Sequence, residues 1–371
     1  MPVAFNPVGM KYVFAGYVFS KEYNSPPAWI ERIKAYTGIL EALAQNNEVV
    51  SIEQIDYEGE YEKDGVKYFF KRFTNPKGNL VNTFIKSRQP DVVIIQSLHY
   101  PLQVMRLRLK LGKQVRIIIQ NHAEKPFTGI KKYLQKLSDK FTDGYLFASH
   151  QLGAKWVQTG NLASASKIHE VMEVSSVFSQ MDKLTAKQRT GVKDGLIFLW
   201  IGRLNDNKDP LTVLKAFLRF AEVKPSARLY MIYHTEELLG QVQALLNDSS
   251  QKNAVTLIGK VPHDELQYWF NSADIILSGS HYEGSGTAVC EAMSCGCMPV
   301  VTDIDSFRMI TDNGKCGLLY EAGNEAALLT ALHQIDQIDM AGKQKASLDY
   351  FKSNLSFEAI ARRIQEIAES L

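Results

Sequence analysis

Two stretches in the second half of the chain decide the fold: WIGRLNDNKDPLTVLKAF at 200–217 and SGSHYEGSGTAVCEAMSCGCMPVV at 278–301. Each contains a short apolar run, a polar or glycine-containing loop and then a segment with helical spacing, which predicts a strand, a loop and a helix. Continuous apolar strands indicate a parallel sheet covered by helices on both faces. Ligands bind such sheets beyond the carboxyl ends of the strands, so we expect the functional residues in these loops.

The same alternation of apolar runs and amphipathic segments occupies most of the chain. The runs that predict strands are 11–19, 48–55, 66–73, 91–96, 114–120, 144–149, 195–202, 227–233, 254–259, 274–278 and 298–302. The pattern weakens over 174–194, which we interpret as a linker between two α/β domains, each a Rossmann-like doubly wound sheet. The expected domains are 1–188 and 189–355. A last amphipathic helix, with Ser356 as its N-cap, is expected over 356–371.

Composition is that of an ordinary globular protein. The 371 residues include 45% hydrophobic and 22% charged residues, and the formal net charge is +2. No apolar run approaches the roughly 18–20 residues that span a bilayer, and the first residues lack the features of a signal peptide, so a cytoplasmic location is predicted. The four cysteines lack a zinc-like spacing and are interpreted as reduced, buried residues: they are Cys290, Cys295, Cys297 and Cys316.

Charge is distributed unevenly. Residues 1–188 contain 25 basic and 17 acidic residues, whereas 189–371 contain 17 basic and 23 acidic ones. The densest basic stretch is 101–140, with ten basic and two acidic residues. Such a stretch attracts an anionic surface or substrate, here an anionic membrane surface bearing a lipid-linked acceptor. The alternative is that it forms two solvated helix faces.

The loop after the predicted strand 195–202 contains Arg203 and Lys208. A guanidinium fork and a compact ammonium group suit two linked phosphates that approach the carboxyl end of the strand. The alternative interpretation is a pair of surface cations.

The loop after the predicted strand 274–278 contains Glu283, Gly284, Ser285 and Gly286, and a helix is expected from about Thr287. Glycines allow close approach of the backbone, and a helix N-terminus presents free N–H groups to a phosphate. Glu291, one turn into the helix, could accept hydrogen bonds from a ribose diol. A glycine pair before a helix is weak evidence alone; the two glutamates flanking it make the pattern more specific.

These segments resemble the family 4 retaining glycosyltransferases, which have the GT-B fold of two Rossmann-like domains facing a central cleft. The resemblance is carried by GRLNDNK at 202–208, by the E-x7-E motif from Glu283 to Glu291, by EAMSCGCMPVVTD at 291–303 and by TDNGKCGLLYEAGNEAAL at 311–328. It is dense over about 195–335 and thinner over 1–190, where IIIQNHAEKP places His122 after a strand, as the family often does.

The resemblance implies a role for each matching residue. Those assigned to catalysis are His122, Arg203, Lys208 and Glu283. Those assigned to binding the donor are Arg203, Lys208, Lys260, Val261, Glu283, Gly284, Ser285, Gly286, Thr287 and Glu291. Two departures concern local contacts: Ser285 stands where the family often has a bulky apolar residue, and SKEYNSPPAW at 20–29 lacks the double glycine that many relatives carry.

The function implied is a retaining glycosyltransferase of the hexosyltransferase type that acts in cell-surface polysaccharide or glycolipid biosynthesis. Its donor would be a nucleotide-diphosphate sugar, with UDP the first choice and GDP the second. Its acceptor would be a saccharide or a lipid-linked saccharide. No metal, other cofactor or nucleic acid is expected. Two alternatives stay open: a nucleotide-sugar epimerase of the same fold, and a non-catalytic basic binding protein.

Several other polar residues near predicted strand ends receive structural interpretations. His99, His150 and His281 are expected to be structural, and Asp303 and Asp305 are expected to cap the next short helix rather than to bind a metal.

Overall fold

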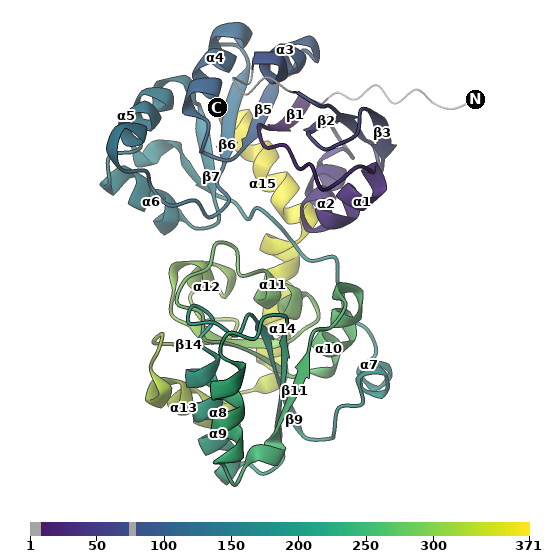
Figure 1. Cartoon of the computed structure of the whole chain (residues 1–371), viewed down its shortest axis with the longest axis vertical. Coiled ribbons are helices and arrows are strands. Elements are labelled where there is room, and N and C mark those ends of the chain that lie inside the picture. The colour runs from purple at the N-terminus through teal and green to yellow at the C-terminus, as the bar shows by residue number, and fades with distance from the viewer. Residues whose placement is uncertain (1–8, 74–78) are drawn as a thin grey trace, which may run out of the picture. The chain divides into compact units, whose positions relative to one another are not determined.

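The computed structural model describes residues 9–73 and 79–371 and divides the chain into two compact units (Figure 1). The first unit comprises Met1–Ser175 and Phe357–Leu371, and the second comprises Ser176–Ser356. Each unit is built on one sheet with helices packed on it.

The first unit has an eight-stranded sheet of order β3-β4-β2-β1-β5-β6-β7-β8. The strands are β1 (Lys11–Gly16), β2 (Glu48–Glu53), β3 (Gly59–Lys63), β4 (Val66–Phe70), β5 (Val92–Gln96), β6 (Arg116–Gln120), β7 (Gly144–Phe147) and β8 (Ile168–Glu170). The helices before the second unit are α1 (Pro26–Arg32), α2 (Lys34–Leu43), α3 (Asn79–Ser87), α4 (Pro101–Leu111), α5 (Gly129–Ser138) and α6 (His150–Gln158). Because β1 pairs in parallel with both β2 and β5, the strand order reverses beside β1.

One edge of this sheet differs from the all-parallel prediction. β3 pairs antiparallel with β4, through a two-residue turn in which Asp64 and Gly65 have φ values of 48° and 82°. An Asp-Gly pair suits a tight hairpin because both of its residues tolerate positive φ. The sequence therefore contained the signal for this hairpin, but β3 is polar and lies at the edge, so it lacks the apolar run that marks most of the other strands.

The second unit has a parallel six-stranded sheet of order β11-β10-β9-β12-β13-β14. The strands are β9 (Leu196–Gly202), β10 (Ala227–Tyr233), β11 (Val255–Gly259), β12 (Ile275–Ser278), β13 (Met298–Thr302) and β14 (Leu318–Tyr320). The helices are α7 (Lys183–Thr190), α8 (Pro210–Val223), α9 (Leu239–Asn247), α10 (Leu266–Ser272), α11 (Thr287–Ser294), α12 (Asp305–Ile310), α13 (Glu325–Gln334) and α14 (Met340–Tyr350). Phe198, Phe217 and Phe220 pack edge to face in its core, between β9 and α8.

The first boundary between the units lies earlier than the expected position at 188. The second unit begins at Ser176, and α7, inside the expected linker, packs against α10. The backbone N–H of Met181 donates to Asn271 Oδ1 at 2.8 Å, and Lys183 forms an ion pair with Asp274. Polar composition hid this helix, because it buries only Ala186 and is held largely by polar contacts.

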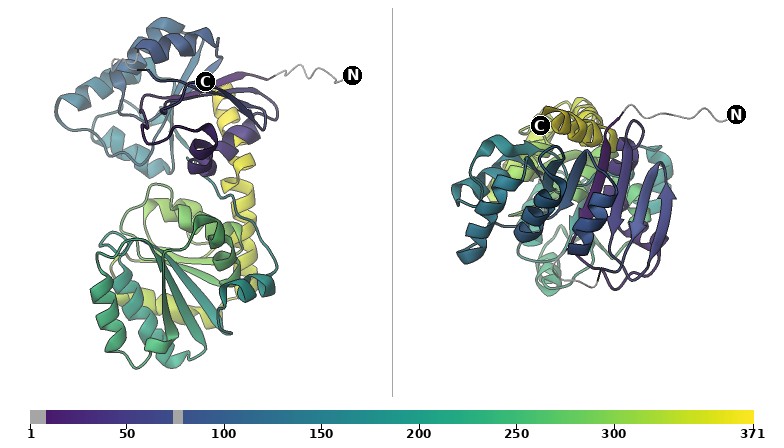
Figure 2. Two further views of the ribbon diagram at one scale, coloured as in Figure 1. Left: turned by 45° about the vertical axis from the view of Figure 1, so that its right-hand side comes forward. Right: turned by 90° about the horizontal axis from the view of Figure 1, so that it is seen from above.

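The last helix, α15 (Phe357–Ser370), packs on α2 of the first unit (Figures 1 and 2). Its buried stripe includes Ile360, Ile364 and Ile367. A Cβ on Gly38 of α2 would lie 2.7 Å from the Phe357 ring, so a glycine is needed for this close packing. The helices in the described parts of the chain all lack the length and apolar character needed to cross a bilayer.

The packing of α15 predicts the stability of the first unit. Ile364→Ala should lower the free energy of unfolding by about 2–5 kcal/mol, because it leaves a cavity under a side chain that is 3% exposed. Chemical denaturation measures this change. Glu366→Ala, on the exposed side of the same helix, is the matched control and should change stability by less than about 1 kcal/mol. If Ile364→Ala and Glu366→Ala had equal midpoints of chemical denaturation, the packing of α15 on α2 would be contradicted.

Candidate active site

The site in the second unit lies where the strand order reverses. β9 is paired with β10 on one side and with β12 on the other, and the two predicted phosphate-binding loops follow β9 and β12. Backbone contacts join these loops: the N–H of His281 donates to the carbonyl of Asn207 at 2.8 Å, and Asn207 Nδ2 donates to the carbonyl of Tyr282 at 3.0 Å. Ligands bind open α/β sheets at this kind of crevice.

Lys208 and Glu283 form an ion pair between the two loops. Their side chains are 26% and 14% exposed, respectively. Ser306 Oγ fixes the Glu283 loop by donating to the carbonyl of Glu283 at 2.5 Å. The structure therefore brings together two residues predicted from separate motifs. A diphosphate that binds Lys208 would take over the role that the Glu283 carboxylate now fills.

Arg203 lies at the end of β9, exposed at the same edge of the sheet. Its guanidinium makes no hydrogen bond or ion pair with any side chain in the described ranges 9–73 and 79–371. Arg203 thus differs from Lys208, whose charge is already balanced. A guanidinium of this kind retains all of its donors for an incoming anion.

The N-terminus of α11 lies directly after Glu283. Gly286 is its N-cap with a φ of 59°, and a Cβ at this position would lie 2.8 Å from the Phe307 ring. Glycine is therefore needed both for the backbone conformation and for the packing against Phe307. Of the side chains that the structure describes, none caps this helix end, and Ser285 Oγ lies 3.3 Å from Thr287 Oγ1. The uncapped first turn suits a phosphate.

Glu291 is 4% exposed inside α11, and its Oε1 lies 2.9 Å from His263 Nε2. The His263 side chain is 45% exposed and its ring centroid lies 4.9 Å from that of Phe178. Sequence reasoning selected Lys260 and Val261 from the loop after β11 but missed His263. The position of His263 in that loop, beyond a strand end, was the available signal. Lys260 is exposed and Val261 is half-buried.

His122 belongs to the first unit and is held on both sides. Its Nδ1 lies 2.5 Å from Glu173 Oε2, and its Nε2 lies 2.7 Å from Gln96 Oε1. Burial lowers the pKa of His122, but the hydrogen bond and charge of Glu173, with the charge of Glu124, outweigh it and raise the pKa. Both ring nitrogens are therefore occupied, and a contact with a sugar hydroxyl would have to replace one of these partners.

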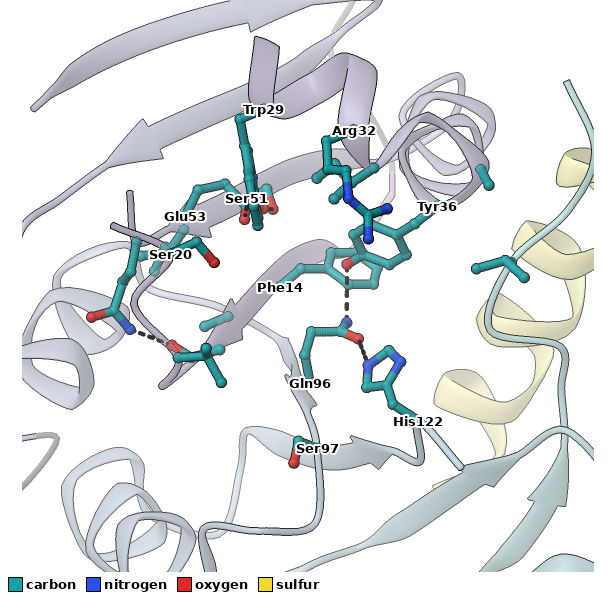
Figure 3. A pocket seen from close by; sticks show the side chains of 18 of the residues that line it. Phe14, Ser20, Trp29, Arg32, Tyr36, Ser51, Glu53, Gln96, Ser97 and His122 are labelled. Carbon is teal, nitrogen blue, oxygen red and sulfur yellow. Dashed lines mark hydrogen bonds between the residues drawn. The ribbon is translucent and has the colours of Figure 1, made fainter. Parts of the chain in front are cut away.

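A cavity of about 560 Å³ in the first unit lies beside His122 (Figure 3). It is lined by residues at the carboxyl ends of three strands: Gly16 of β1, Glu53 of β2 and Gln96 of β5. Like the site of the second unit, it lies where the strand order reverses. Phe14, Trp29 and Tyr36 supply much of its apolar wall.

Glu53 is one of two carboxylates that line this cavity, and the other is Glu124. Trp29 Nε1 donates to its Oε2 at 2.9 Å, and Ser51 Oγ donates to its Oε1 at 2.6 Å. Burial raises the pKa of Glu53, although both hydrogen bonds act to lower it. In Figure 3, Trp29, Ser51 and Glu53 cluster at one side of the cavity, and Arg32, Tyr36, Gln96 and His122 lie at the other. An apolar cavity with a few fixed polar groups is typical of a binding site for a small molecule.

The remaining candidates have structural partners or remain on the rim. The backbone N–H of His150 donates to Glu170 Oε2 at 2.9 Å, and His281 Nε2 lies 3.2 Å from Asp209 Oδ2. His99 lines the cavity of the first unit. The expected capping by Asp303 is wrong: Ile304 is the N-cap of α12, and both oxygens of Asp303 bind Arg308.

The four cysteines are buried and unbridged, and burial raises the pKa of the Cys295 thiol to about 12. Over 9–73 and 79–371, no group of three or more His, Cys, Asp and Glu side chains has a geometry that could hold a metal ion.

Part of the second unit is similar to known proteins. Residues 182–344 match the model of the family described as glycosyl transferases group 1. A D-inositol 3-phosphate glycosyltransferase of Pseudarthrobacter chlorophenolicus is 28% identical over 41% of this chain and 37% of its own length. The chain spans less than half the length of such curated relatives. The resemblance is confirmed for group 1, whereas family 4 stays a prediction.

Solved structures confirm the fold. A glycosyltransferase from Rickettsia africae has a TM-score of 0.74 at 16% identity, covering 98% of both chains. Anabaena HepE in complex with UDP and glucose has a TM-score of 0.68 at 13% identity, covering 98% of this chain and all of the other. The predicted GT-B architecture of two Rossmann-like domains is thus confirmed.

The His122–Glu173 contact predicts a pH dependence. Because the folded-state pKa of His122 is raised, the pair should stabilise the fold fully below about pH 6.5, the usual histidine value. That stabilisation should be lost as pH rises through the raised pKa. NMR titration of His122 should give a lower pKa in Glu173→Gln than in the wild type. Glu60→Gln, exposed on β3, is the control. An unchanged His122 titration in Glu173→Gln would refute the pairing.

Proposed function

From the group 1 glycosyltransferase segment at 182–344, we propose that the chain is a glycosyltransferase enzyme that uses a nucleotide-diphosphate sugar. The observation that carries this proposal lies within the matched segment. At one sheet edge, the structure places Lys208, Glu283 and the uncapped N-terminus of α11 together. A cation and a helix N-terminus bind phosphates, and a carboxylate beside them binds sugar hydroxyls.

The donor diphosphate would lie between Arg203, Lys208 and the first turn of α11. Departure of the diphosphate builds negative charge on its terminal phosphate oxygens, and these groups are preorganised to stabilise that charge in the transition state. The fixed positive charge that a metal supplies elsewhere would come here from side chains and the helix. Glu291 would accept hydrogen bonds from the ribose and exchange its contact with His263 for them.

We propose transfer with retention by attack on the same face of the sugar. The bond between the anomeric carbon and the phosphate oxygen breaks, and the acceptor oxygen forms a bond to that carbon. The proton of the acceptor hydroxyl passes to the departing phosphate oxygen. UDP is the first choice of nucleotide and GDP the second. Support for UDP comes from the structural likeness to an Anabaena protein whose structure contains UDP and glucose.

The acceptor would enter the cavity of the first unit. Glu53 offers hydrogen-bond acceptors to sugar hydroxyls, and Trp29 offers an apolar wall for a sugar ring. We propose a saccharide or a lipid-linked saccharide as the acceptor, in cell-surface polysaccharide or glycolipid synthesis at the inner membrane face. The net basic stretch 101–140 supports the lipid-linked form.

A panel of nucleoside diphosphates tests the donor site. UDP, GDP, ADP, dTDP and CDP are added separately, with a chelator present, and the melting temperature is measured. One nucleotide should raise it, because ligand binding to the native state adds RT ln(1 + [L]/Kd) of stability. No shift with any nucleotide at millimolar concentration would contradict the proposal. Formation of an epimerised nucleotide sugar without an acceptor would instead favour the epimerase.

Removal of the site cations should abolish turnover. Lys208→Met or Arg203→Met should lower the rate of sugar transfer from the identified donor about 10²–10³-fold, the usual loss for one transition-state contact. Lys215→Met, exposed on α8 of the same unit, is the matched control. Melting temperature without ligand shows whether each variant is folded. A folded Lys208→Met or Arg203→Met enzyme with a near-normal rate would overturn the assignment of that residue.

A further inference from the structure

The helix α5 buries polar side chains and exposes apolar ones. Its buried residues are Gln135 and Ser138, whereas Ile130, Tyr133 and Leu137 are 77%, 69% and 45% exposed, respectively. The exposed residues recur at a spacing of three and four, so they form one stripe along the helix. A helix that packs on a sheet normally turns its apolar stripe towards the core. The outward stripe of α5 therefore needs another explanation.

Apolar exposure is concentrated on this part of the first unit. The neighbouring helix α4 packs against α5 and exposes Leu102 (42%) and Leu109 (77%). Five of the twelve large hydrophobic side chains that are exposed in the described chain thus lie on these two helices. Single exposed apolar residues are common on proteins, but a gathered set indicates an interaction surface.

The exposed side of α5 and the residues just after it are also strongly basic. Lys131, Lys136 and Lys140 are exposed, and none pairs with an acidic side chain of the described chain. The sequence of α5 contains no acidic residue, and Asp139, which follows it, is 2% exposed. We call Ile130, Lys131, Tyr133, Lys136, Leu137 and Lys140 the α5 face. Its positive charge is not balanced locally, so it will attract an anionic partner.

Three kinds of partner would use different features of the α5 face. A second copy of the chain would place one cluster of lysines against another, and like charges repel. A single-stranded nucleic acid would use the lysines, but it also stacks its bases on several aromatic rings, and Tyr133 is the one aromatic side chain of the α5 face. An anionic bilayer uses both features, since lipid phosphates pair with lysines and the acyl region receives the apolar stripe.

We propose that the α5 face is a membrane-docking surface for anionic lipid. α5 lies in the plane of the lipid headgroups, with Ile130, Tyr133 and Leu137 inserted below them. Lys131, Lys136 and Lys140 extend their aliphatic stems along the stripe and place their ammonium groups among the phosphates. Leu102 and Leu109 of α4 enlarge the apolar contact (Figure 1 shows both helices). This surface deepens the proposed function, because it would present the first unit to a lipid-linked acceptor.

Co-sedimentation with vesicles tests this surface in the full chain. The probe is phosphatidylglycerol mixed with phosphatidylcholine, compared with phosphatidylcholine alone. The wild type should bind the anionic vesicles, and 0.5 M salt should weaken binding, because salt screens the lysine–phosphate attraction. Ile130→Ser/Leu137→Ser and Lys131→Glu/Lys136→Glu should each weaken binding about tenfold or more. Melting temperatures should stay close to the wild-type value, since the replaced side chains are exposed.

Matched controls lie on the second unit. Val223→Ser replaces an apolar side chain that is 65% exposed, and Lys252→Glu replaces an exposed lysine. Both controls should bind vesicles like the wild type. Equal binding by the α5-face variants and the controls, or absence of wild-type binding to anionic vesicles, overturns the proposal. The proposal is also overturned if the α5-face variants abolish self-association of the chain instead of vesicle binding. It is likewise overturned if the wild type binds RNA but not vesicles and the α5-face variants abolish that RNA binding.

The nucleotide panel separates this inference from the proposed function. The α5-face variants should keep the wild-type nucleotide-induced melting shift, because these residues lie outside the donor site. Vesicle binding without any nucleotide shift would leave the docking surface standing and remove the donor site. A nucleotide-induced rise in melting temperature without vesicle binding would support the donor site and overturn the docking surface.

Discussion

The central position of β9 is the constraint on which the rest of the second unit depends. β9 pairs in parallel with β10 on one side and with β12 on the other. The chain therefore adds β10 and β11 on one side of β9 and then crosses to add β12 on its other side. Two loops distant in sequence, 203–209 and 279–286, are thereby forced to one sheet edge. The hydrogen bonds between Asn207 and the 281–282 backbone then fix their spacing. The pairing of Lys208 with Glu283 follows from this topology.

Both carboxylates of the proposed donor site already have partners within the second unit. Glu283 faces Lys208, and Glu291 faces His263. Removing a carboxylate from water costs less free energy when a cation or a hydrogen-bond donor lies beside it. The charges of the proposed donor site are therefore balanced by groups of the second unit itself. Arg203, by contrast, is exposed, and its guanidinium has no side-chain partner among the residues that the structure describes.

Strands could be predicted from the sequence where a local pattern specifies them. Ten of the eleven predicted strand runs begin within one residue of an observed strand, because apolar runs between turns are a local pattern. The polar edge strand β3 and the polar helix α7 were missed, since both are held by pairing partners rather than by an apolar stripe. His263 was missed because its role depends on Glu291, which is distant in sequence.

The two candidate sites differ in how their residues are encoded. Those of the donor site come from two strand–loop–helix units, each readable as one motif within the segment that matches a known family. The cavity of the first unit takes Trp29, Glu53, Gln96 and His122 from four separate elements or loops. Of these four residues, His122 alone lies in a stretch that carries the family resemblance, IIIQNHAEKP. Residues that come from one strand–loop–helix unit can be recognised from their spacing in the sequence, whereas side chains that come from separate elements are brought together only in the folded unit. In the proposed function, the identity of the acceptor would be set by Glu53 and its neighbours in the folded first unit rather than by any local sequence pattern.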